Sequence, residues 1–247
     1  MISVAMAAYN GEKYIKAQID SILSQIGRED ELVVSDDGSD DATCTIVESI
    51  AGGDSRVKLI RNRDRGVIPN FENALLHCRG DIIFLSDQDD IWLPGKVETV
   101  SRAIQSGADL VLTDAIVADE NLQPINDSFY EFNKSKKGIM NNLLHNSFHG
   151  CTMAFNSRIK DIALPISKRV PMHDIWLGHL AMLFGKVRYL PEKLVIYRRH
   201  EKNATGYEKS PIWQKLWWRA CIVFPVAARA VKIMLTGTGV HRPRLFA

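Results

Sequence analysis

The fold of this chain is decided by one stretch, Ile82-Ile83-Phe84-Leu85-Ser86-Asp87-Gln88-Asp89-Asp90-Ile91-Trp92-Leu93-Pro94. It opens with an apolar run that predicts a buried strand. Three carboxylates follow within four positions, and like charges this close repel and raise each other's pKa. A divalent cation usually compensates such acids, and it is often shared with substrate phosphates. A solvated acidic turn is the alternative, but the strand before the acids and the Trp and Pro after them favour a cation site.

The composition is that of an ordinary globular protein, since 46% of the 247 residues are apolar and 24% are charged. The four cysteines are widely spaced and form no C-x-x-C pair, which indicates reduced thiols and not disulfides or a zinc site. The N-terminus lacks a charged segment before its first apolar run, and no uncharged apolar run is long enough to span a membrane. We therefore expect a cytoplasmic location, no secretory signal, no membrane span and no nucleic-acid partner.

Strands and helices alternate over the first part of the chain. The predicted strands cover residues 2–7, 31–34, 57–60, 82–85 and 110–113. Such alternation predicts right-handed crossovers and a mostly parallel sheet flanked by helices on both faces. Ligands of these sheets bind beyond the carboxyl ends of the strands. Polar clusters follow the strands at those ends, at Tyr9-Asn10, Asp36-Asp37, Asp87-Gln88-Asp89 and Asp114.

The alternation weakens after about residue 120. Residues 121–135 are expected as a loop or irregular hairpin, and residues 138–146 and 173–184 as helices. Residues 148–156 are expected as a strand whose Gly150 lets the backbone approach a ligand. Two short strands are expected at 187–190 and 195–197.

Five short motifs stand in order along the chain. They are Ala7-Ala8-Tyr9-Asn10-Gly11, Ser35-Asp36-Asp37-Gly38-Ser39, Asp87-Gln88-Asp89-Asp90-Ile91-Trp92, His173-Asp174-Ile175-Trp176 and Tyr197-Arg198-Arg199-His200. In this order and spacing they resemble glycosyltransferase family 2, the inverting enzymes of GT-A fold that use nucleotide-sugar donors. The resemblance implies an α/β, Rossmann-like GT-A domain over residues 1–206, with a nucleotide-binding half (1–118) and an acceptor-binding half (119–206). An amphipathic, basic helical tail would follow at 207–247.

A finer resemblance concerns residues 66–75, which are similar to a bacterial subgroup associated with rhamnosyl transfer and polysaccharide assembly. The Q-x-x-R-W motif of processive synthases is absent from the sequence. This absence favours the transfer of one sugar per encounter over the growth of a polymer.

The resemblance implies a role for each acid after the first strands. Asp37 would accept the N3–H of uracil or thymine, in a pocket also lined by Ala7 and Tyr9; an Asx-turn is the alternative role for Asp37. Asp89 would bind Mg²⁺ or Mn²⁺, with Asp87 assisting, and the ion would stabilise the leaving nucleoside diphosphate.

Asp174 would be the general base that accepts the proton of the acceptor hydroxyl. A plain helix cap is the alternative, and His173 stands where many relatives carry an acid, so the role of base falls to Asp174 alone. Arg198 and His200 follow a strand and would contact the diphosphate or the ion. An exposed basic turn is the alternative for Arg198, Arg199 and His200.

The tail differs from the rest of the chain in its charge. The net charge is +2, and the seven lysines and arginines from Lys209 onward, without an acidic residue among them, leave −5 on residues 1–208. At helical spacing the basic face carries Gln214, Lys215, Arg219, Arg229 and Lys232, and the opposite side carries Trp213, Trp217 and Phe224. This pattern predicts a helix in the interface of an anionic membrane, kinked at Pro225. Packing on the catalytic body or a dimer contact is the alternative.

These features together predict an inverting, metal-dependent glycosyltransferase at the inner face of a bacterial membrane. It would move one sugar from a UDP- or dTDP-linked donor to a glycan or lipid-linked acceptor in cell-surface polysaccharide synthesis. A sugar nucleotidyltransferase would need a Gly- and Lys/Arg-rich loop after the first strand, and no G-x-G-x-x-G of a dehydrogenase occurs. A non-catalytic, membrane-bound scaffold of the same fold is the alternative from another class.

Overall fold

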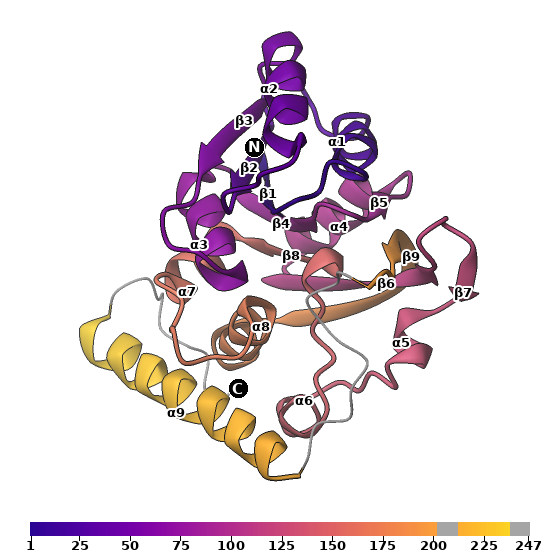
Figure 1. The fold of residues 1–247 in the computed structure, drawn as a ribbon. Coiled ribbons are helices and arrows are strands. Elements are labelled where there is room, and N and C mark those ends of the chain that lie inside the picture. Colours follow the sequence, from indigo (N-terminus) through magenta and orange to yellow (C-terminus); the bar gives the residue numbers. More distant parts are fainter. Residues whose placement is uncertain (202–211, 238–247) are drawn as a thin grey trace.

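The computed structural model describes residues 1–201 and 212–237 (Figure 1). The described strands form a sheet in the order β3-β2-β1-β4-β8-β6-β9-β5, with β7 paired to β6. They are β1 (Ile2–Ala8), β2 (Glu31–Asp36), β3 (Val57–Arg61), β4 (Ile82–Asp87), β5 (Ile91–Trp92), β6 (Leu110–Ala118), β7 (Pro124–Asn126), β8 (Met153–Asn156) and β9 (Val187–Arg198). The predicted α/β class, with helices on both faces of the sheet, is confirmed.

The helices divide between the two faces. They are α1 (Ile15–Leu23), α2 (Thr43–Gly53), α3 (Val67–His77), α4 (Lys96–Gln105), α5 (Phe129–Phe132), α6 (Ile139–Leu144), the 3₁₀ turn η1 (Gly150–Thr152), α7 (Ser157–Ala163), α8 (His173–Phe184) and α9 (Ile212–Thr236). Buried residues of α1, α2 and α4 pack on one face of the sheet. Buried residues of α3, α7, α8 and α9 belong to the layer on the other face.

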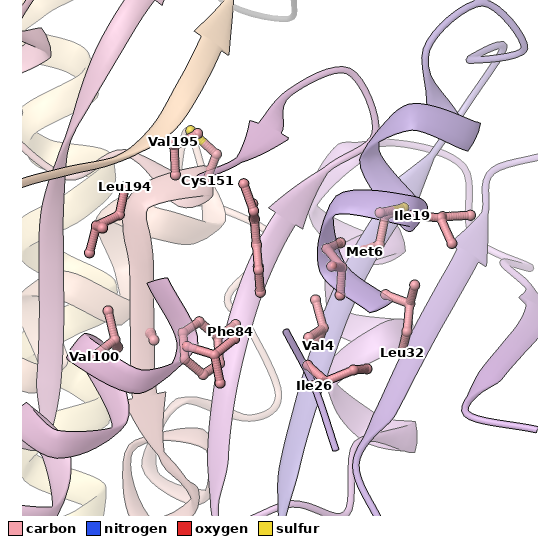
Figure 2. Packing of buried hydrophobic residues seen from close by; sticks show 14 of the residues in the cluster. Val4, Met6, Ile19, Ile26, Leu32, Phe84, Val100, Cys151, Leu194 and Val195 are labelled. Atoms are coloured by element: carbon pink, nitrogen blue, oxygen red, sulfur yellow. The ribbon is translucent and has the colours of Figure 1, made fainter. Parts of the chain in front are cut away.

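The side chains of β1 alternate between these layers, as the two-residue period of a strand requires. Val4 and Met6 pack with Ile19 of α1 and Leu32 of β2, as Figure 2 shows. Ala5, between them in the chain, belongs to the opposite layer. Because both faces are covered, β1, β2 and β4 are apolar in their middle parts and do not alternate between apolar and polar residues there.

The second half of the sheet departs from the predicted parallel arrangement. β8 runs antiparallel to both β4 and β6, whereas β6 and β9 are parallel. The two short strands expected at 187–190 and 195–197 form the single strand β9. Pro191 lies where the pairing with β6 shifts register after Leu112, and such an irregularity tolerates a residue without an N–H.

Asp114 lies inside β6 and not at the end of a strand, which corrects the expectation from the sequence. Its buried carboxylate accepts hydrogen bonds from Ser128 Oγ at 2.6 Å and from the Tyr130 N–H at 2.9 Å. Asp114 therefore anchors the segment that leads into α5, and it takes no part in a polar cluster at the sheet's edge.

One face of α9 packs on the rest of the domain, as the alternative for the tail supposed. Ile222, Val226, Ala230 and Ile233 are buried in the layer that α7 and α8 form. Figure 1 shows α9 beside α8. The helix continues through Pro225, where we expected a kink. The predicted boundary between residues 206 and 207 lies outside the described residues, as do the side chains of 212–216. Within the described part of the chain, none of the helices combines the length and apolar character needed to cross a bilayer.

Two arginines of α9 face the body, which corrects their assignment to a free basic face. Arg219 donates from Nε to the Leu143 carbonyl at 3.1 Å. Arg229 donates from Nη1 to the carbonyls of Ile162 and Leu164 at 2.8 and 2.9 Å. These guanidinium groups satisfy main-chain acceptors and hold the helix against the domain.

Glu31 joins four segments at the amino end of the sheet. Its buried carboxylate accepts hydrogen bonds from Ser3 Oγ, Lys58 Nζ and the Arg79 N–H, each at 2.7 Å. Burial pushes the pKa of Glu31 upward, but the bonds from Lys58, Arg79 and Ser3 outweigh it and lower the pKa from 4.5 to about 2. The ionised carboxylate is therefore part of the folded structure.

We expect Glu31→Gln to lower the free energy of unfolding near neutral pH by about 2–4 kcal/mol, because it leaves two cations without their partner. A lowered folded-state pKa contributes stability above the unfolded pKa of 4.5 and loses it as the pH falls through about 2. Urea unfolding at several pH values measures the difference between the parent and the variant. A difference of the same size in strong acid and at neutral pH would contradict this role.

Candidate active site

A pocket opens at the carboxyl ends of β1, β2 and β4, beside the N-terminus of α8. Six of the residues predicted from the sequence line it, namely Ala7, Tyr9, Asp37, Asp87, Asp89 and Asp174. They come from four separate parts of the chain. Arg198 and His200 are not part of this lining, but both contact Asp89 in the acidic loop that follows β4.

Asp87 ends β4 with its carboxyl group close to three other acids. Burial raises the pKa of Asp87 well above its usual value of 3.8, and the negative charges of Asp90, Asp89 and Asp174 raise it further. Acids that converge in this way are unfavourable as bare carboxylates and favourable around a divalent cation. An all-oxygen donor set of this kind fits Mg²⁺ or Mn²⁺.

Asp90 is buried, and its contact with β9 stabilises the fold. Its Oδ1 accepts a hydrogen bond from the Arg198 N–H at 3.0 Å, which ties the acidic loop to the end of β9. Asp87, Asp90 and Cys151 bring their ligand atoms within 4.8 Å of one another. Burial, however, raises the pKa of the Cys151 thiol well above its usual range, and a protonated thiol is a poor ligand for a hard cation. An ion held by Asp87 is therefore better placed toward Asp89.

Asp89 is held by the residues that end and follow β9. His200 Nε2 lies 2.8 Å from Asp89 Oδ2, and the imidazole stacks on Tyr14. Arg198 donates from Nε to the Asp89 carbonyl at 2.7 Å and from Nη1 to the Glu120 carbonyl at 2.6 Å. His200 thus lies at the side chain of the predicted metal ligand, and Arg198 fixes its backbone.

Asp37 lies on the side of the pocket next to β2. Its carboxylate accepts hydrogen bonds from Asn62 Nδ2 at 2.7 Å and from the Gly66 N–H at 2.8 Å. Each of these oxygens keeps a second lone pair for a ligand. The neighbouring Asp36 makes the Asx-turn contact, because its carboxylate accepts from the Gly38 N–H at 3.0 Å.

Asp174 lies in the first turn of α8, directly at the pocket. The N-cap residue of this helix is Met172 and not Asp174, although Asp174 Oδ1 accepts a hydrogen bond from the first-turn Ile175 N–H at 2.6 Å. Burial raises the pKa of Asp174 from 3.8 to about 7, against the lowering effect of the Ile175 and Gly150 N–H groups. A carboxyl group that titrates near neutrality has the proton affinity that a general base needs.

Two imidazoles lie in the same pocket wall. His173 stacks on Phe71 with 3.8 Å between ring centroids, and His149 stacks on Phe129 at 4.4 Å. Burial lowers the pKa of His173 to about 3 and that of His149 to about 4. Both rings are therefore neutral and weakly basic, which leaves Asp174 as the better base.

The pocket-lining residues that sequence reasoning did not assign include Asn70, Phe71, Gln88 and His149. The first two lie in the stretch 66–75, whose similarity to a bacterial subgroup was the available signal. His149 lies in the stretch 148–156, where a close backbone approach to a ligand was expected. Gln88 gave no signal, because an amide between two acids has no role that spacing alone reveals.

Residues 3–163 match the family model described as glycosyl transferase family 2. The chain belongs to this family. An uncharacterized glycosyltransferase of Haemophilus influenzae is 27% identical over 218 residues, which cover 83% of this chain and 68% of that protein. The UDP-Glc:alpha-D-GlcNAc-diphosphoundecaprenol beta-1,3-glucosyltransferase WfgD of Escherichia coli is 31% identical over 153 residues, which cover 61% of this chain and 58% of that protein. The aligned part thus spans roughly three fifths to two thirds of each of these relatives.

Two solved structures share the fold. Residues 1–349 of Staphylococcus aureus TarS, in complex with UDP-GlcNAc, match with a TM-score of 0.70 at 19% identity, covering 93% of this chain and 66% of that one. The mannosyltransferase PcManGT of Pyrobaculum calidifontis, in complex with GDP-Man and Mn²⁺, matches with a TM-score of 0.63 at 18% identity, covering 96% and 76%. These likenesses confirm the predicted GT-A architecture.

We expect Asp174→Asn to stabilise the protein above about pH 7 and to change its stability little near pH 4. Folding raises the pKa of the Asp174 carboxyl group, so the free energy of unfolding falls as the pH rises from 3.8 to about 7. The amide of the variant does not titrate and causes no such loss. At about 1.4 kcal/mol per pKa unit, the gain at pH 8 should be about 2–4 kcal/mol. Urea unfolding without divalent cations measures it.

The exposed Asp161→Asn is the matched control and should show no such pH dependence. If the effect of Asp174→Asn were constant from pH 4 to about pH 8, the raised pKa of Asp174 would be refuted.

Proposed function

We propose that this protein is an inverting, metal-dependent glycosyltransferase that moves one sugar from a UDP- or dTDP-linked donor to a glycan or lipid-linked acceptor in cell-surface polysaccharide synthesis. The observation that carries this proposal is the convergence of Asp87, Asp89 and Asp174 on one pocket that Asp37 also lines. Membership of glycosyl transferase family 2 supports the transfer chemistry.

In this proposal the nucleoside binds at the β2 side of the pocket. Asp37 would accept the N3–H that uracil and thymine share, while Ala7 and Tyr9 flank the base. The similarity of residues 66–75 to rhamnosyl-transferring proteins supports a hexosyl or rhamnosyl donor. Gly66 connects that stretch to the nucleoside pocket, because its N–H donates to Asp37.

Asp89 and Asp87 would hold Mg²⁺ or Mn²⁺, with His200 beside Asp89. When bound, the ion supplies positive charge that stabilises the diphosphate leaving group. The presence of Mn²⁺ beside GDP-Man in PcManGT supports this assignment, because the two proteins share a fold. Arg198 would keep the loop in place through the Asp89 carbonyl.

Asp174 would remove the proton from the acceptor hydroxyl as that oxygen attacks the anomeric carbon from the face opposite the diphosphate. One C–O bond forms while the bond to the diphosphate breaks, so the configuration inverts. A base for this step must be ionised and within hydrogen-bond reach of the hydroxyl. The pKa of about 7 supports the role, since a large share of Asp174 is ionised at neutral pH while its proton affinity stays high.

Titration of UDP, dTDP and a panel of their sugars, with and without Mn²⁺, tests this proposal. We expect metal-dependent thermal stabilisation by one of the two nucleotides, and slow release of nucleoside diphosphate from the matching sugar donor. If none of them bound, the nucleotide-sugar assignment would be lost. If nucleotide binding depended on the metal but no combination of donor and glycan acceptor gave turnover, the non-catalytic scaffold would be the remaining alternative.

Two variants separate donor binding from chemistry. Asp89→Ala should weaken Mn²⁺-dependent nucleotide binding at least about tenfold, because it removes the proposed ligand. Asp174→Asn should lower turnover by about 10²–10⁴-fold and change donor affinity little, since a base acts on the acceptor. The exposed Asp161→Asn should change neither. Near-normal turnover of Asp174→Asn would remove it as the base, and metal-dependent binding retained by Asp89→Ala would remove it as the ligand.

We further propose that the outer face of α9 places the protein on an anionic membrane surface. This face carries Trp217, Phe224, Val231 and Leu235, which are 65%, 72%, 53% and 81% exposed. The first three lie seven residues apart and so form one line along the helix. Bulky apolar side chains on the outside of a helix that is already docked support an interfacial role.

The cations that accompany this apolar line come partly from the body. Phe224 borders a surface groove together with Lys168 and Arg169 of the α7–α8 loop and with Lys232 of α9. Lys168, Arg169 and Lys232 are exposed. These three residues would therefore attract anionic lipid in place of Arg219 and Arg229. Each lysine or arginine near an anionic membrane contributes about 1 kcal/mol to binding.

We expect the double variant Phe224→Ser, Leu235→Ser to lose at least about tenfold in affinity for vesicles that contain anionic lipid, because burial of two large apolar side chains is lost. Co-sedimentation measures the affinity, and Leu76→Ser on α3, a comparably exposed leucine, is the control. These substitutions leave the buried face of α9 intact, unlike removal of the helix. Undiminished co-sedimentation would refute the membrane role, and concentration-dependent dimerisation abolished by the double variant would replace it.

A further inference from the structure

The side chain of Gln88 forms a two-point contact with the main chain of Tyr9. Gln88 Oε1 accepts a hydrogen bond from the Tyr9 N–H at 2.9 Å, and Gln88 Nε2 donates to the Tyr9 carbonyl at 2.8 Å. One side-chain amide thus pairs with both backbone groups of a residue 79 positions earlier, as an adjacent strand would. The amide orientation is determined, because a flipped amide would place donor against donor.

Gly11 provides the space that this amide occupies. A Cβ at Gly11 would lie 2.1 Å from Gln88 Oε1 and 2.4 Å from Gln88 Cδ. Gly11 is not among the described glycines with a positive φ, so its backbone conformation is open to any residue. A side chain at this position would therefore displace the end of the Gln88 side chain. The motif after β1 and the acidic motif after β4 are therefore sterically matched to each other.

The loop after β1 is held from its other side by the loop after β2. The Asn10 N–H donates to Ser39 Oγ at 2.9 Å, and the Gly11 N–H donates to Thr43 Oγ1 at 2.8 Å. The β2–α2 loop also carries Asp37. The loop after β1 thus lies between the segment proposed to bind the nucleobase and the acids proposed to bind the cation.

We propose that Gln88 is a positioning residue, which sets the spacing between the nucleoside end and the diphosphate end of the pocket before a donor arrives. This inference rests on the proposed nucleotide-sugar function. A nucleoside diphosphate spans both ends, and a pocket with preset spacing loses less conformational freedom when it binds. Gln88 acts through the Tyr9 backbone, and its neighbours Asp87 and Asp89 are thereby kept in register with Asp37.

Hydrogen exchange of the nucleotide-free protein tests the contact itself. Gln88→Ala and Gln88→Met both remove the two hydrogen bonds, and Gln88→Met retains much of the side chain's length and volume. Each should speed exchange of the Tyr9 amide at least about tenfold, because its acceptor is gone. The melting temperature should change little, since the loop lies outside both core layers. Exchange as slow as in the parent would overturn the inference, whatever the protein binds.

Affinity for UDP and dTDP in the presence of Mn²⁺ tests the role of the contact. Gln88→Ala and Gln88→Met should each weaken binding about tenfold, which is the scale of one or two lost hydrogen bonds. Retained affinity together with faster exchange at Tyr9 would overturn the positioning role. If the parent bound neither nucleotide, the proposed function would fail, while the exchange experiment would still decide whether the contact exists.

A double-mutant cycle with Gly11 supplies the control for specificity. Gly11→Ala should weaken nucleotide binding about as much as Gln88→Ala, because its methyl group displaces the amide. In the Gln88→Ala background the same Gly11→Ala change should cost less than about twofold, since the clashing atoms are gone. Losses that simply add in the double variant would overturn the steric match on which the inference depends.

Discussion

The active-site half of this structure depends on the mutual repulsion of the acids beyond β4. Asp87 lies half-buried next to Asp89, Asp90 and Asp174, and burial together with these like charges raises its pKa well above the usual value. Glu31, at the opposite end of the sheet, is a buried acid whose contacts stabilise the fold. There Lys58 and Arg79 neutralise the carboxylate and lower its pKa to about 2. The contrast between Glu31, which is paired with two cations, and Asp87, which lies near three other acids, is the physical basis for proposing a cation at Asp87.

Several described contacts that hold the acidic loop involve its main chain or neutral groups. The Arg198 guanidinium donates to main-chain carbonyls, and the Arg198 N–H pairs with Asp90. Gln88 contributes a neutral amide. These contacts fix the position of the loop, and Asp87 lines the pocket beside it. Under the proposed function, this arrangement would be preorganised for a diphosphate and its cation.

The two sides of helix α9 differ, so packing on the domain does not exclude the membrane role proposed for the tail. Its buried side, with Ile222 and Val226, completes the layer over α8. Its outer side keeps Trp217 and Phe224 in contact with solvent. A helical wheel separates basic from aromatic residues, but it cannot tell which arginines bind carbonyls of the body. Arg219 and Arg229 bind such carbonyls because main-chain carbonyl groups of α6 and α7 lie beside them.

The sequence by itself determined the α/β class, the covered strands of the first half and the set of acids after them, because apolar runs and strand-end polar clusters are local patterns. The resemblance to glycosyltransferase family 2 also predicted a shared site for Ala7, Tyr9, Asp37, Asp87, Asp89 and Asp174, and all six line the pocket. The first five follow strands of the parallel sheet, whose carboxyl ends meet at one edge, whereas Asp174 lies at the start of a helix. Only the tertiary structure decided that β8 runs antiparallel, that Asp114 lies inside β6, and that Gln88 fills the space beside Gly11. Strand direction, burial and steric fit depend on contacts between residues that are distant in the chain. No local sequence pattern shows which of these residues contact each other.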